Sequence, residues 1–123
     1  MLRMHGALTP ATPIDPVGEG FEVVLRNADA VLYHAALLPG DLSRARRSTF
    51  LDRAAASGRG RRNGLFRVSL LRRERRYHFA VQAYADLTGA TLPTMTIRIA
   101  IGDDVFVSAA DWRRTRFGWA LDF

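Results

Sequence analysis

The chain has 123 residues, a net charge of +6 and no cysteine. This length suits a single domain whose core needs no covalent cross-link. The lack of cysteine excludes disulfide frameworks, thiolate metal sites and cysteine nucleophiles. All 18 basic residues are arginine, which also excludes a Schiff-base lysine and the lysine of a phosphate-binding P-loop.

The first residues predict a linker. Prolines at positions 10, 13 and 16 favour an extended conformation over residues 1–18. This segment has one arginine and no long apolar core, so it is not typical of a signal peptide. A linker here predicts the last module of a longer protein, or a gene fragment; as part of a longer chain we expect it to be exported, whereas a true start at Met1 predicts a cytoplasmic protein. Residues 19–123 are then expected to form one domain.

The remaining residues predict short strands, because apolar and polar side chains alternate along them as they do on the two faces of a sheet. Glycine, asparagine, aspartate and proline separate the alternating runs and are typical of turns. The first two runs are joined by few residues and predict a hairpin. The expected strands are residues 21–26, 31–38, 48–52, 65–72, 77–85, 95–101, 105–108 and a last one that starts at residue 112.

The segment over residues 42–58 is ambiguous between helix and strand. Its three alanines at 54–56 favour a helix, but its apolar residues make a poor helical stripe. We expect a strand at residues 48–52, followed by a short helical turn at residues 53–57.

This rhythm of short strands and turns predicts an all-β fold. We expect an antiparallel β-sandwich of about seven or eight strands, with a small barrel as the alternative. No long amphipathic helix is available to cross over a parallel sheet. The expected core contains Phe66, Val68, Phe79, Val81, Met95, Ile97, Ile99 and Trp119.

Three segments resemble a known kind of module. They are GLFRVSLLRR at 64–73, HFAVQAYADL at 78–87 and PTMTIRIAIGDDVF at 93–106. In their strand rhythm they resemble immunoglobulin-like all-β accessory modules near the ends of exported bacterial proteins. The resemblance implies a sandwich that contacts a protein or a neighbouring domain, and it implies no catalytic residues.

Charge is distributed unevenly along the chain. From Arg44 to Arg76 there are 12 arginines and two acidic residues, whereas residues 77–123 contain four arginines and five aspartates. If the middle segment lies on one side, the field of the folded molecule is polarised, which suits nucleic acid or another polyanion. A solvated basic surface produces the same pattern. The candidate polyanion-binding residues are Arg59, Arg61, Arg62, Arg72, Arg73, Arg75 and Arg76.

These arginines form two groups on either side of a predicted strand. One group lies in the glycine-rich loop at 58–64 and the other in the turn at 72–76, with the strand at 65–71 between them. A strand separates its two ends by roughly 3.3 Å per residue. The sequence therefore places the two groups at opposite ends of the domain rather than in one patch.

Other candidates are weaker. Trp112, expected to be exposed, and Tyr84 are candidates for stacking on carbohydrate or a small ligand, or for an interface with a neighbouring domain. Asp86, Asp103 and Asp104 offer oxygen ligands for calcium, although aspartate is also an ordinary turn residue. The three histidines show no metal-ligand spacing, and no cofactor motif is present.

The sequence thus favours a non-enzymatic accessory or interaction module that contacts a protein or a neighbouring domain. One alternative is arginine-mediated binding of nucleic acid or another polyanion. The other is binding of carbohydrate or a small ligand.

Overall fold

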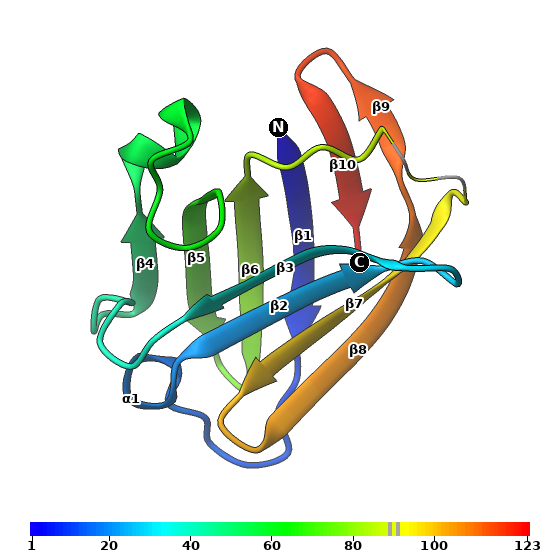
Figure 1. The fold of residues 1–123 in the computed structure, drawn as a ribbon. Coiled ribbons are helices and arrows are strands. Elements are labelled where there is room, and N and C mark those ends of the chain that lie inside the picture. Colours follow the sequence, from blue (N-terminus) through cyan, green and yellow to red (C-terminus); the bar gives the residue numbers. More distant parts are fainter. Residues whose placement is uncertain (89, 91) are drawn as a thin grey trace.

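The computed structural model describes residues 1–88, 90 and 92–123. Two β-sheets stack face to face, and the strands of one cross those of the other at a steep angle (Figure 1). All strand pairings are antiparallel except one, and the sheets do not close into a barrel. The predicted all-β sandwich is confirmed, with ten strands in the described residues rather than seven or eight.

The larger sheet has six strands and forms the back of the sandwich in Figure 1. Four of its strands form one antiparallel run, and the other two form an antiparallel hairpin that joins this run through the single parallel pairing. In spatial order they are β4 (Arg47–Leu51), β5 (Leu65–Arg73), β6 (Arg76–Ala83), β1 (Leu2–Leu8), β10 (Gly118–Asp122) and β9 (Arg113–Thr115).

The smaller sheet has four strands, and the predicted hairpin at its edge is confirmed. Asn27 closes that hairpin, since its side-chain oxygen accepts hydrogen bonds from the N–H groups of Asp29 and Ala30. In spatial order the strands are β3 (Val31–Leu37), β2 (Phe21–Arg26), β7 (Thr94–Ile101) and β8 (Asp104–Asp111).

Two short helical segments complete the described elements: α1 (Pro16–Glu19) and the 3-10 turn η1 (Arg53–Ser57). The second confirms the prediction of a strand followed by a helical turn. Asp52 caps η1 by accepting a hydrogen bond from the N–H of Ala54, and Gly58 ends it in the left-handed conformation that glycine adopts readily.

The linker predicted over residues 1–18 is wrong for Leu2–Leu8, which form β1 in the middle of the larger sheet. Leu2 and Met4 are fully buried, and β1 pairs with β6 on one side and in parallel with β10 on the other. The alternation of Leu2, Met4 and Leu8 with polar residues is the signal for this strand. The prolines that follow β1 end this strand, and the linker conformation that they favour does not include Leu2–Leu8.

The last predicted strand is also corrected. Instead of one strand from residue 112, the chain forms the β9–β10 hairpin, which turns at residues 116 and 117. Phe117 is therefore 61% exposed, whereas Trp119 is buried as predicted and Leu121 is also buried.

The core lies between the sheets and contains seven of the eight predicted residues. Phe66 is the exception, because a bulge at the start of β5 shifts the register between Leu65 and Arg67. Leu65 takes the buried position, and Phe66 is half-buried with its ring edge against Tyr84, at 5.7 Å between ring centroids.

Candidate functional site

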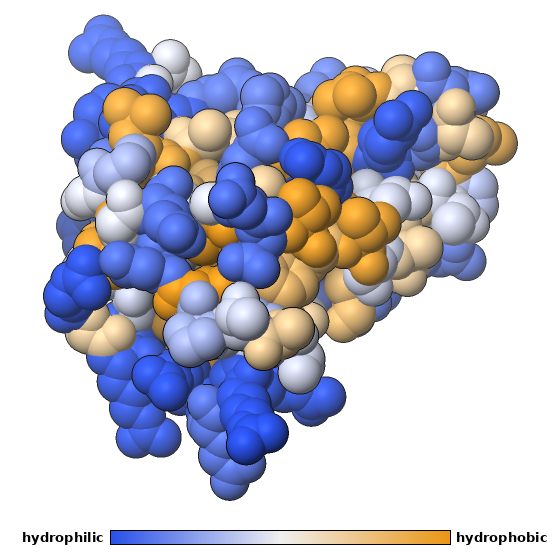
Figure 2. All heavy atoms as spheres, turned by 90° about the horizontal axis from the view of Figure 1, so that it is seen from below, coloured by the Kyte–Doolittle hydropathy of each residue, from blue (hydrophilic) through white to orange (hydrophobic). Residues whose placement is uncertain are grey.

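The outer face of the six-stranded sheet is strongly basic. Because side chains alternate along each strand, the residues between the buried ones on β1, β4, β5, β6 and β9 point away from the core. In Figure 2, which looks at the lower end of the molecule, long hydrophilic side chains project on the side of this sheet. We name this surface the basic face: Arg3, Arg47, Arg67, Arg73, Arg76 and Arg113, with His5 and His78.

The strand register arranges the basic face in rows that run across the sheet. One row reads Arg67, Gln82, Arg3, Ala120 and Arg113 from β5 to β9. The next reads Thr49, Ser69, Ala80, His5 and Asp122, and the third reads Arg47, Leu71, His78 and Ala7.

These rows contain a single acidic residue. Asp122 accepts a hydrogen bond from Nη1 of Arg113 at 3.0 Å, so its charge is compensated within the face. Positive charge therefore exceeds negative charge from β4 across to β1, whereas the pair on β9 and β10 is balanced.

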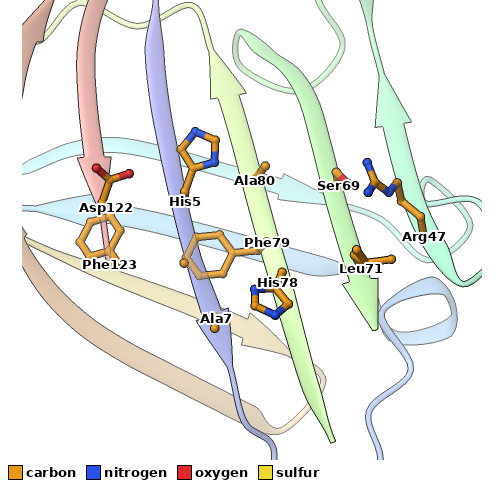
Figure 3. A pocket seen from close by; sticks show the side chains of 11 residues that line it. His5, Ala7, Arg47, Ser69, Leu71, His78, Phe79, Ala80, Asp122 and Phe123 are labelled. Atoms are coloured by element: carbon orange, nitrogen blue, oxygen red, sulfur yellow. The ribbon is translucent and has the colours of Figure 1, made fainter. Parts of the chain in front are cut away.

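The middle of the basic face is hollowed, with a volume of about 440 Å³. It is lined by the small side chains of Ala7, Ala80 and Ser69, which is only 9% exposed although it faces outward, and by the apolar side chains of Leu71, Phe79 and Phe123. Figure 3 shows His5 and His78 beside these residues, with Arg47 on the opposite side of Ser69 and Asp122 beyond His5. The hollow therefore combines small and apolar lining residues with basic and titratable side chains at its rim.

Arg3 has an unusual environment. Its guanidinium lies 5.6 Å from the ring centroid of Phe117, and its Nε is shielded from solvent without a hydrogen-bond partner.

The outer face of the four-stranded sheet is different. There the carboxylate of Glu22 lies 3.1 Å from Nε2 of His34 and 3.0 Å from Nη1 of Arg98. One carboxylate thus contacts two of its basic side chains, so this face has less net positive charge than the basic face.

The structure confirms that the two predicted arginine groups lie apart, at opposite ends of β5. Arg73 and Arg76 belong to the basic face, and Arg72 and Arg75 line a groove beside Tyr77 and the prolines that follow β1. Arg46, the residue before β4, contacts the same turn, since the N–H of Arg72 donates to the carbonyl oxygen of Arg46 at 3.3 Å.

The group at 58–64 has a different role. Arg62 donates from Nε and Nη2 to the carboxylate of Asp41 at 2.7 and 3.2 Å, and this hydrogen bond lowers the pKa of Asp41. The backbone N–H of Arg61 donates a hydrogen bond to the carboxylate of Asp52. The guanidinium of Arg61 lies 5.6 Å from the ring centroid of Phe50. Arg61 and Arg62 therefore help to fold the loop, although the side chain of Arg61, like that of Arg59, is exposed.

Sequence reasoning missed Arg3, Arg47, Arg67, Arg113, His5 and His78 as members of one surface. Their position on the outward parity of strands was readable. Their convergence was not, because it depends on the order of the strands in the sheet.

The aromatic candidates do not form a common surface. The ring of Trp112 packs against the core rather than standing exposed, and its backbone N–H donates to the carbonyl oxygen of Pro93. Tyr84 is 39% exposed and lines a hollow with Ala55 and Gly64, and Trp112 is not among the residues that line it.

The calcium candidates are also separated. Asp86 accepts a hydrogen bond from the N–H of Thr88 at 2.9 Å, which lowers the pKa of Asp86 and explains it as a turn residue. Asp103 and Asp104 lie at the β7–β8 turn, at the other end of the sandwich (Figure 1). In the part of the chain that the structure describes, no three acidic or histidine side chains gather as metal ligands.

The β8 edge exposes apolar side chains. Val105 and Val107 are 47% and 65% exposed, and β8 contains no arginine or proline. Beside it, a hollow of about 360 Å³ opens between the sheets and is lined by apolar side chains, including Phe106 and Phe123. Figure 2 shows hydrophobic surface at this end of the molecule.

No protein-family model, curated protein or solved structure matches this chain. The resemblance to immunoglobulin-like modules therefore stays a prediction, and any functional argument depends on the geometry of the surface. Among the described residues, no helix has the length and apolar character needed to cross a bilayer.

Proposed function

We propose that this domain is a non-enzymatic binding module whose partner is nucleic acid, held by its phosphate backbone on the basic face. The observation that supports this proposal is the presence of six arginines on one sheet face against one carboxylate, which is itself paired. Arginine presents a planar fork of donors that matches phosphate oxygens.

The composition of the rows favours a duplex over a single strand. The outward positions of the three rows hold no phenyl, phenol or indole ring, and the exposed ring of Phe117 lies only at one edge beside Arg3, so unpaired bases have no row of rings on which to stack. The six strands span about 24 Å at roughly 4.8 Å per strand, which equals the rise of about seven base pairs. Contacts to the backbone alone would make binding independent of base sequence.

Fluorescence anisotropy with a labelled DNA duplex of about 20 base pairs at low salt tests the proposal. The triple variant Arg47→Ala/Arg67→Ala/Arg76→Ala removes exposed charges from the basic face, and we expect its affinity to fall by at least tenfold. The matched control, Arg26→Ala/Arg53→Ala/Arg59→Ala, removes the same charge from exposed positions elsewhere and should bind nearly as tightly as the unchanged domain.

Three outcomes would contradict the proposal. They are undetectable binding at low salt, an equal loss in both triple variants, and tighter binding of heparin than of the duplex at equal charge concentration. The last result would assign the basic face to an acidic polysaccharide.

The β8 edge supports a second candidate function, contact with another protein strand. Its unpaired backbone groups and exposed valines are suited to strand addition. A second copy of the chain is the simplest partner, because two β8 strands can pair around a two-fold axis. Light scattering over a range of concentrations should then show a dimer that Val107→Lys abolishes, and a strict monomer at every concentration excludes this candidate.

A further inference from the structure

The hollow in the basic face has the features of a seat for one anionic group. His5 on β1 lies opposite Ala80, and His78 on β6 lies opposite Ala7, so the two histidines are diagonal neighbours. Their Cβ atoms are then about 7 Å apart, close enough for both imidazoles to reach one tetrahedral anion between them. The small side chains that line the hollow leave room for that anion.

We propose that this hollow holds one phosphate group of the bound nucleic acid, and that protonated His5 and His78 hold it together with Arg47. The inference rests on the proposed function and adds a position for one phosphate and a dependence on pH. The Ser69 hydroxyl, in the lining of the hollow beside Arg47, is a further donor to the same group (Figure 3).

The charges that face the two histidines agree with this assignment. His5 on β1 lies opposite Asp122 on β10, and Asp122 already accepts a hydrogen bond from Arg113. His78 faces Leu71 on β5 and Ala7 on β1, with Arg73 and Arg76 at the adjoining ends of their strands.

Histidine is the side chain whose charge ordinarily changes between pH 5 and 8. An anion beside it stabilises the protonated form, so binding must strengthen as the pH falls. A phosphodiester keeps its charge over this range, and the change in affinity therefore reports on the protein.

The test measures duplex affinity at about pH 7.5 and about pH 5.5 at constant ionic strength. We expect affinity to rise about tenfold in the unchanged domain at the lower pH, the effect of a gained charge-assisted hydrogen bond. The variant His5→Gln/His78→Gln should bind like the unchanged domain at the higher pH and lose the rise. The control His34→Gln alters the histidine of the opposite face and should keep the rise.

A second measurement does not depend on the polymer. Proton NMR follows the imidazole titrations with and without tripolyphosphate, and the midpoints of His5 and His78 should move to higher pH while that of His34 stays unchanged. Duplex affinity that is independent of pH, or a rise that survives in His5→Gln/His78→Gln, overturns the inference and leaves the proposed function intact. Absence of duplex binding overturns the proposed function, and unmoved histidine midpoints then overturn the anion seat as well.

Discussion

Two arginines of the same basic segment have opposite roles, and their neighbours decide which. Arg62 is mostly shielded and is bound by both carboxylate oxygens of Asp41, so it holds the loop before β5 against the loop before β4. Arg67, five residues later, has no such neighbour and projects from the basic face. Composition counts both as positive charge, but only the second is available to a partner.

The Asp41–Arg62 pair predicts a dependence of stability on pH. Arg62 lowers the pKa of Asp41 below its usual value of 3.8 in the folded protein, so the carboxylate stabilises the fold above that pH. This contribution is lost as the pH falls through the folded-state value. Asp41→Asn should therefore lower the urea midpoint at neutral pH, and the difference from the unchanged protein should shrink below about pH 4.

Urea unfolding monitored by tryptophan fluorescence between pH 3 and 7 measures this difference. Asp103→Asn serves as the control, because it changes an exposed carboxylate of the β7–β8 turn and should leave the midpoint unchanged. A midpoint difference for Asp41→Asn that is constant over the whole range would contradict the assignment.

At the scale of elements, period-two alternation was a sufficient guide wherever the backbone was regular. It predicted β2, β3, β5, β6 and β7 and most of the core, because a buried face demands apolar residues at every second position. It failed where the backbone departs from a regular strand. One place is the bulge in β5, where Leu65 rather than Phe66 is buried, and the other is the turn between β9 and β10.

The central place of β1 gives a direct test of its structural role. Met4 is fully buried between β6 and β10, so Met4→Ala should leave a cavity and lower the free energy of unfolding by about 2–5 kcal/mol. Chemical denaturation measures the loss. Thr12→Ala, in the exposed stretch after β1, should change stability by less than about 0.5 kcal/mol, whereas similar values for both variants would indicate that β1 does not belong to the cooperative fold.

At the scale of the whole molecule, the candidate site could be predicted only in part. The charge bias of residues 44–76 foretold a polarised domain, and the separation of the two arginine groups followed from the length of one strand. The basic face itself joins β1 and β9 to that segment through non-local pairings. A single sequence does not specify such pairings, because alternation identifies strands without identifying their neighbours.

The charge of the basic face also predicts how strongly salt weakens the affinity for a duplex. If the six arginines of the basic face neutralise about five phosphates of a duplex, the logarithm of the affinity should fall against the logarithm of the salt concentration with a slope of about −4.5. The anisotropy titration repeated at several salt concentrations measures this slope. The basic-face triple variant should have a slope shallower by about three, and a slope near zero for the unchanged domain would exclude phosphate contacts.

The parallel pairing of β1 with β10 has a mechanical consequence. The amino end of β1 and the carboxyl end of β10 lie toward opposite ends of the larger sheet (Figure 1), and the strands are in register from Leu2 with Trp119 to His5 with Asp122. Tension applied to the two termini would slide these strands past each other in shear. Their hydrogen bonds would then share the load instead of opening one by one, so this pair of strands acts as a clamp against pulling.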